Sequence, residues 1–251
     1  MAMRRDVWTV PAPSLGGQGT VLAYGHWGTP VLFFPAEAGS AYDIENNGII
    51  DALAGPLEHG HLKVYVVDTH DRHTWSDTSL PIEERARRHE GYQSWINEQV
   101  APAIHGDCGG YTPIATTGVS MGAFHAVNTT LRRADLFPHA VGMSGNYDPT
   151  TWNSWGEAGE AVYFNNPFAY VANCGGDHLD WLRGRVFIQL AAGSGAFEDH
   201  PTYAQASSRA LAELLGAKGI RNHLDVWGTD TPHDWPSWRR MVAAHVAPLG
   251  A

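Results

Sequence analysis

The chain has 251 residues, of which 43% are hydrophobic and 17% charged, so it can bury a sizeable core and is not intrinsically disordered. Its formal net charge of −10 argues against a nucleic-acid partner, because phosphate binding needs clustered Lys and Arg. No apolar run approaches the roughly 18 residues that span a bilayer, so we expect a cytoplasmic protein without a membrane partner.

Short β-branched or aromatic runs alternate with longer helical patterns, which predicts an α/β fold with a mostly parallel sheet and helices on both faces. The pattern indicates strands at residues 6–10, 20–25, 30–34, 63–67, 114–119, 140–143, 185–191 and 222–226. Helices are expected at residues 44–53, 81–103, 122–133, 200–216 and 234–247. The first two strands read as antiparallel edge strands, since prolines and a Gly-Gly pair separate them.

We expect a single domain over residues 1–251, because Gly and Pro are spread along the chain and no repeat or linker is visible. Residues 147–182, rich in Trp, Asn and Gly, are irregular by comparison and would form a small cap or a substrate-facing loop. Cys108 and Cys174 are too few for a disulfide framework and are predicted to be free thiols.

The segment Gly118-Val119-Ser120-Met121-Gly122 joins a predicted strand to a predicted helix. Gly-x-Ser-x-Gly places a serine on a tight turn whose strained backbone the flanking glycines permit. Such a turn exposes the hydroxyl at the carboxyl edge of the sheet and aims the free amides of the next helix at it. Ser120 is therefore the predicted nucleophile, and the Met121 amide a predicted oxyanion donor. His125 lies five residues along that helix and is interpreted as a packing or surface residue.

The catalytic partners of such a serine follow on the loops after later strands, first the acid and then the histidine. His233 lies after the last predicted strand and is the predicted base, whereas His223 stands at the opposite end of that strand. Glu198 and Asp199 follow the preceding strand, and their spacing does not separate them as the acid. The carboxylate that is not the acid would cap the next helix.

Three motifs resemble the putative esterase family of α/β-hydrolases, which includes esterase D-type S-formylglutathione hydrolases and mycolyltransferases. They are Gly118-Val119-Ser120-Met121-Gly122-Ala123, Met143-Ser144-Gly145-Asn146-Tyr147-Asp148, and residues 228–238 with their His-Asp-Trp-Pro-x-Trp run. The resemblance implies an α/β-hydrolase fold of eight strands, with little or no separate cap domain.

The resemblance also bears on the remaining site residues. Esterase D-type enzymes carry Gly-x-x-Asp after the acid-bearing strand, and Gly195-Ala196-Phe197-Glu198 matches this spacing with Glu, the residue that mycolyltransferases use. It therefore favours Glu198 over Asp199. A second oxyanion amide is implied in the loop of residues 34–40, with Ala38 the first candidate and Glu37 the second. The cysteine that S-formylglutathione hydrolases carry near their substrate has no match, so glutathione is not implied.

A metal site could be drawn from His59, His61, Asp68, His70, Asp71 and His73, but the first two precede a predicted strand and the others follow it. The two groups would lie at opposite ends of the sheet, about 15 Å apart, so no metal site is predicted. Asp68, His70 and His73 could instead touch substrate. Trp152 and Trp155 could line a pocket.

The sequence thus predicts a serine carboxylesterase that hydrolyses a small-molecule ester through an acyl-enzyme on Ser120, without a cofactor. Two alternatives stay open. One is an acyltransferase of the same fold, and the other is a catalytically silent hydrolase-fold binding protein. A homodimer is compatible with the sequence.

Overall fold

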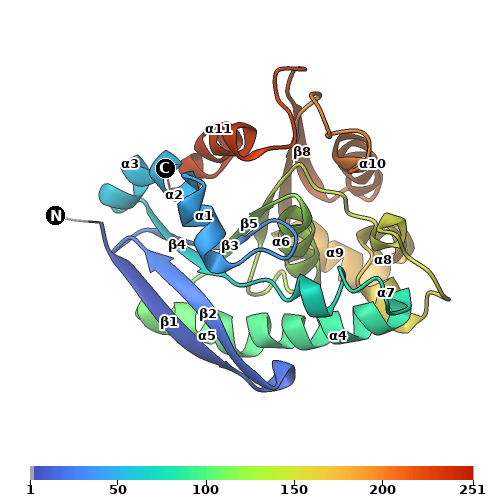
Figure 1. The fold of residues 1–251 in the computed structure, drawn as a ribbon, viewed down its shortest axis with the longest axis horizontal. Coiled ribbons are helices and arrows are strands. Elements are labelled where there is room, and N and C mark those ends of the chain that lie inside the picture. The colour runs from blue at the N-terminus through green and yellow to red at the C-terminus, as the bar shows by residue number, and fades with distance from the viewer. Residues whose placement is uncertain (1–2, 251) are drawn as a thin grey trace.

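The computed structural model describes residues 3–250, so Met1, Ala2 and Ala251 lie outside it. These residues form an eight-stranded sheet in the order β1-β2-β4-β3-β5-β6-β7-β8 (Figure 1). The strands are β1 (Arg5–Ala12), β2 (Gly17–Tyr24), β3 (Thr29–Phe34), β4 (Leu62–Val67), β5 (Ala115–Val119), β6 (His139–Met143), β7 (Phe187–Ala192) and β8 (Arg221–Val226). The strand count and the mostly parallel pairing confirm the predicted architecture.

The antiparallel part of the sheet is confined to its beginning. β1 pairs with β2, and β2 pairs with β4, both antiparallel. Of these two antiparallel strands, β1 alone lies at an edge of the sheet, which is why it tolerates Pro11. The prediction that residues 20–25 also form an edge was wrong, because β2 is covered by β4 on its other side.

Helices cover both faces of the sheet. They are α1 (Ala41–Asn46), α2 (Ile49–Ala52), α3 (Ala54–Glu58), α4 (Ile82–Trp95), α5 (Ala101–Asp107), α6 (Met121–Arg132), α7 (Glu160–Phe164), α8 (Pro167–Asn173), α9 (Gly176–Arg185), α10 (Ala204–Ala217) and α11 (Trp235–His245). The helix expected at residues 44–53 is divided, because Gly48 adopts a left-handed φ of 72° between α1 and α2. A π-helical turn, Ile96–Val100, joins α4 to α5.

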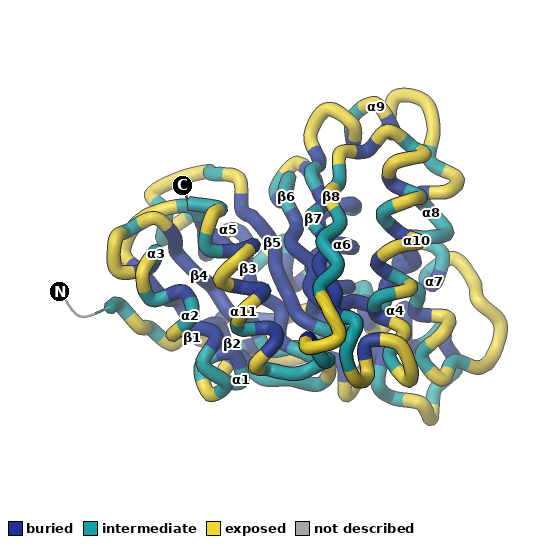
Figure 2. Tube along the Cα trace, turned by 90° about the horizontal axis from the view of Figure 1, so that it is seen from above, coloured by how far each residue is buried: buried dark blue, intermediate teal, exposed yellow. Residues whose placement is uncertain are grey.

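The segment expected to be irregular is largely helical. It contains α7, α8 and most of α9, which gather with α10 at one end of the sheet (Figure 2). Asn166 begins α8 by accepting a hydrogen bond from the Phe168 amide, and Pro167 follows at the first helical position. Val171 and Leu182 are buried against α6 and β7. These helices are too short to show the periodicity that identifies longer ones.

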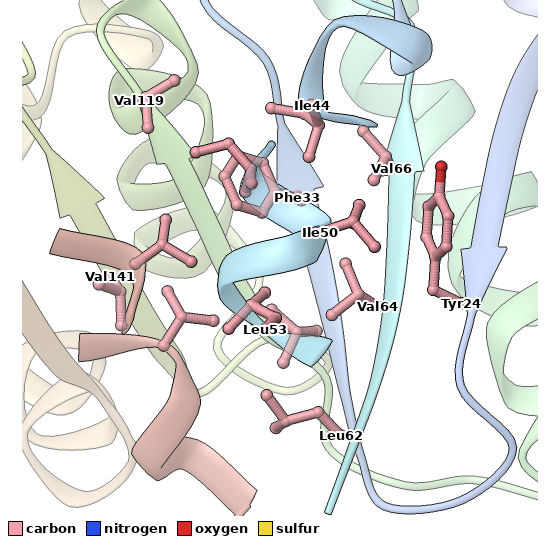
Figure 3. Close-up of a cluster of buried hydrophobic side chains, with 14 of the residues drawn as sticks. Tyr24, Phe33, Ile44, Ile50, Leu53, Leu62, Val64, Val66, Val119 and Val141 are labelled. Atoms are coloured by element: carbon pink, nitrogen blue, oxygen red, sulfur yellow. The ribbon is translucent and has the colours of Figure 1, made fainter. Parts of the chain in front are cut away.

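Apolar side chains fill both faces. On one face Ile44, Ile50 and Leu53 pack with Phe33 and residues of α11 (Figure 3). On the other, aromatic residues of α4 and apolar residues of α6 pack against the same central strands. All residues of β4 and β5 are buried, as expected for strands covered on both faces. No helix in the described part of the chain is both long and apolar enough to cross a membrane.

Candidate active site

Ser120 lies on a sharp turn between β5 and α6. Its φ of 55° and ψ of −124° are strained for a residue with a side chain. Glycine is required on both sides of it. A Cβ on Gly122 would lie 2.1 Å from the Phe34 carbonyl oxygen, and one on Gly118 would lie 2.2 Å from the Gly122 carbonyl oxygen. The close approach packs the start of α6 against the end of β3.

His233 faces this serine from the loop between β8 and α11. Its Nε2 lies 2.9 Å from Ser120 Oγ. The His233 amide donates a 2.9 Å hydrogen bond to the Ala196 carbonyl, and the ring packs edge-on against Trp238 with centroids 5.0 Å apart. The loop after β7 and helix α11 thus hold the imidazole in place.

Of the two candidate acids, the structure brings Glu198 to the histidine. Glu198 is fully buried, and its Oε1 lies 3.6 Å from His233 Nδ1. Asp199 is exposed. The prediction that the other carboxylate caps the next helix was wrong, because Tyr203 occupies the cap position of α10.

Ser144 is a site residue that sequence reasoning did not single out. It follows β6, is fully buried and has a φ of 53°. Its hydroxyl donates a hydrogen bond to Glu198 Oε1, the same oxygen that faces His233, and its amide donates to the Ala191 carbonyl at 2.7 Å. Two signals were present in the sequence, its position at the carboxyl end of a strand and its place in the motif of residues 143–148, but neither assigned it a role.

The hydrogen bonds of the loop after β3 distinguish the two candidates for the second oxyanion donor. The Ala38 amide donates a 3.0 Å hydrogen bond to Asp71 Oδ2, which counts against Ala38. The Glu37 amide makes no hydrogen bond within residues 3–250, and Glu37 lines the same cavity as Ser120 and Met121. The geometry therefore favours Glu37 together with Met121.

Asp71 connects this loop to the helix that carries the nucleophile. His125 Nε2 lies 2.8 Å from Asp71 Oδ1, and both side chains are buried, as the packing interpretation of His125 expected. The His125 ring stacks on His89 at 5.2 Å, and burial lowers the pKa of His89 well below its usual range. Asp71 thus fixes the loop of residues 35–40 relative to α6.

A cavity of about 540 Å³ opens over Ser120. Its walls combine aromatic and uncharged polar groups with one carboxylate, and they consist of Glu37, Trp75, Ser76, Thr78, Ser120, Met121, Ser144, Asn146, Thr151, Trp152, Asn153, His200, Pro201, Thr202, Tyr203 and His233. Trp152 lines it as suggested, whereas Trp155 lies outside the lining and donates its indole N–H to the Thr78 carbonyl at 2.9 Å.

Arg85 holds the wall of this cavity from behind. Its buried guanidinium donates hydrogen bonds to the carbonyls of Trp75 at 2.9 Å, Trp152 at 3.3 Å and Asn153 at 3.1 Å. Burial lowers the pKa of this group. Charged residues flank Arg85 in the run Glu84-Arg85-Ala86-Arg87-Arg88, which is typical of a solvated helix face, yet Arg85 itself is buried.

Residues 43–249 match the model of the family described as Putative esterase. The chain belongs to the Putative esterase family. A search of curated protein sequences finds no match.

Solved structures share the fold of this chain over nearly its full length. A ferulic acid esterase aligns with a TM-score of 0.75 at 15% identity, covering 100% of this chain and 99% of its own. MPT51 from Mycobacterium tuberculosis aligns with a TM-score of 0.75 at 15% identity, covering 99% and 98%. S-formylglutathione hydrolase from Staphylococcus aureus aligns with a TM-score of 0.71 at 14% identity, covering 100% and 97%. The chain has the α/β-hydrolase fold.

The histidine-rich segments that precede and follow β4 do not line the cavity over Ser120. His59 and His61 precede β4, with ring centroids 5.9 Å apart, and His70 packs against Tyr92 after it. Asp68 accepts the Ala41 amide at 2.8 Å, and neither His70 nor His73 lines the cavity. Among the described residues, no group of three or more His, Cys, Asp or Glu side chains is arranged to hold a metal ion.

Proposed function

We propose that this protein is a serine carboxylesterase that hydrolyses a small-molecule ester through an acyl-enzyme on Ser120. The observation that carries the proposal is the 2.9 Å contact between Ser120 Oγ and His233 Nε2 at the floor of a cavity. A serine hydroxyl is a weak nucleophile unless an adjacent base accepts its proton. Membership of the Putative esterase family supports the same chemistry.

In the first step, Ser120 Oγ attacks the ester carbonyl carbon while His233 Nε2 accepts the hydroxyl proton. The carbonyl oxygen becomes an oxyanion, which the Met121 and Glu37 amides would stabilise by hydrogen bonding. Collapse of this intermediate breaks the bond to the alcohol, and His233 returns its proton to the leaving oxygen. The acyl group remains on Ser120.

In the second step, His233 takes a proton from a water molecule that attacks the acyl carbon. The carboxylic acid leaves, and Ser120 regains its proton. Glu198 would stabilise the imidazolium form and hold the ring, while Ser144 orients the carboxylate. The 3.6 Å separation between Glu198 Oε1 and His233 Nδ1 is longer than a hydrogen bond, and such contacts often shorten when substrate binds.

A 4-nitrophenyl ester chain-length series tests the proposal. We expect Ser120→Ala to lower kcat/KM by about 10⁴-fold or more. Ser94→Ala, on α4 and away from the cavity, is the matched control and should keep wild-type activity. Esters formed with an added alcohol would identify an acyltransferase instead. Hydrolysis that survives Ser120→Ala would contradict the role of Ser120. The absence of both hydrolysis and labelling by a fluorophosphonate would contradict an esterase.

A further inference from the structure

The cavity over Ser120 has an uneven charge. Its described lining contains one carboxylate, that of Glu37, and neither lysine nor arginine. The lining also contains two histidines, His200 and His233. Arg85 is close behind the wall, but it is buried and its guanidinium is directed at backbone carbonyls. A negatively charged substrate would therefore meet no lysine or arginine among the described residues of the cavity surface.

The position of the Glu37 carboxylate is defined by a neighbour. Ser76 Oγ donates a 2.6 Å hydrogen bond to Glu37 Oε1, and both residues line the cavity. The carboxylate thus lies at the cavity wall, on the same residue whose amide is the favoured second oxyanion donor. Glu37 is exposed, so its carboxylate lies on the solvent-facing part of the cavity lining.

Two further features of the protein disfavour anionic substrates relative to cationic or uncharged ones. The chain carries a formal net charge of −10, so the long-range field repels anions and attracts cations. The partly exposed Trp152 lines the cavity, and the face of an indole ring attracts cations. An uncharged acyl or alkyl group can pack on the same ring without an electrostatic penalty.

We propose that this cavity selects uncharged or cationic esters and disfavours esters that carry a carboxylate, with Glu37 as the specificity-determining side chain. The inference rests on the proposed esterase function and adds to it the charge class of the substrate. The Glu37 carboxylate acts on the part of the substrate beyond the ester bond. This role is separate from that of the Glu37 backbone amide, which is the favoured second oxyanion donor.

Three 4-nitrophenyl esters of matched length provide the test: the valerate, which is neutral, the hemiglutarate, which is anionic, and the 4-(trimethylammonio)butyrate, which is cationic. Glu37→Gln removes the charge and keeps the shape. The matched control is Glu213→Gln, which makes the same change of net charge on the exposed side of α10. The quantity compared is the ratio of kcat/KM between charged and neutral esters, at low and high ionic strength.

We expect wild-type protein to hydrolyse the hemiglutarate more slowly than the valerate. Glu37→Gln should raise the anionic-to-neutral ratio by about threefold to tenfold and lower the cationic-to-neutral ratio, as one unit charge in a partly solvated site would. Added salt should raise the wild-type anionic ratio more than that of the variant. Glu213→Gln should leave both ratios at wild-type values.

Unchanged ratios in Glu37→Gln, or an equal shift in Glu213→Gln, would overturn the role of Glu37. Faster wild-type turnover of the hemiglutarate than of the valerate would overturn the charge class. Failure of the esterase function has a different signature, which is the absence of Ser120-dependent hydrolysis of all three esters, and it would overturn this inference as well.

Discussion

Two walls of the cavity are held in different ways. The loop of residues 35–40 is fixed by the buried Asp71 carboxylate, which accepts the Ala38 amide and contacts His125 of α6. A second segment of the lining, residues 151–153, is held through backbone carbonyls by Arg85, and its own side chains are partly or fully exposed. A fixed amide direction suits an oxyanion site, whereas an exposed rim suits substrate binding. We expect changes in the first wall to affect kcat and changes in the second to affect KM.

The largest effect is expected at Glu198, the buried carboxylate beside His233. Glu198→Gln should lower kcat by about 10³- to 10⁴-fold, because the amide no longer stabilises the imidazolium form of His233. Asp199→Asn, at the adjacent exposed position, should change kcat by less than about twofold, because surface changes of this kind have small effects. Steady-state kinetics on both variants checks this. Loss in Asp199→Asn with full activity in Glu198→Gln would reverse the assignment of the acid.

The next effect is expected from Asp71. Asp71→Ala frees the loop of residues 35–40, so kcat should fall by about 10- to 100-fold with KM changed less than threefold, while Asp71→Asn should lose less. Thr130→Val is the control, because it also removes a buried hydrogen bond on α6, to Thr116. It should unfold at a lower temperature yet keep wild-type kcat. An equal fall of kcat in the control would mean that Asp71 acts only through stability.

The exposed rim should respond differently. Arg85→Met leaves the carbonyls of Trp75, Trp152 and Asn153 without their donor, so the rim loses its fixed position. We expect KM for 4-nitrophenyl esters to rise about fivefold while kcat changes less than twofold. A fall of kcat with unchanged KM would remove the distinction between the two walls.

The smallest effect is expected in the pH dependence of the free energy of unfolding, and it arises from His89, which stacks on His125. Burial lowers the pKa of His89 in the folded protein, so the unfolded chain binds a proton there first as the pH falls below about 6.5. The free energy of unfolding should therefore decrease below that pH. His89→Gln should reduce the slope by up to about 1.4 kcal/mol per pH unit. The control is His26→Gln, at an exposed position, which should leave this slope unchanged. Urea unfolding between pH 7.5 and 5 measures the slope for both variants and the wild type.

The sequence carried enough information for the sheet and the nucleophile turn. Buried parallel strands are continuous apolar runs, and Gly118 and Gly122 mark a turn where a Cβ has no room. The three short helices between β6 and β7 were not predicted, because each is stabilised by packing and is too short to show a helical periodicity in the sequence. The single-domain organisation and the cytoplasmic location stay predictions.

Site residues were predictable where a motif marks them and not where a distant contact decides. Ser120 and His233 follow from strand order, and their side chains meet in the structure. The roles of Ser144 and Arg85 depend on partners 54 and 67 residues away in the chain, which no local pattern indicates. The preference for Ala38 as the second oxyanion donor was not supported for the same reason. The hydrogen bond from its amide to Asp71 depends on tertiary packing.

The central claim is covalent catalysis by Ser120, and trapping of the acyl-enzyme tests it most directly. The protein is mixed with a 4-nitrophenyl ester, quenched in acid within milliseconds, digested and analysed by mass spectrometry. We predict that the acyl mass appears on the peptide containing Ser120 in the wild-type protein and is absent from Ser120→Ala. Acylation of another residue, or hydrolysis in Ser120→Ala without an acylated peptide, would contradict the account.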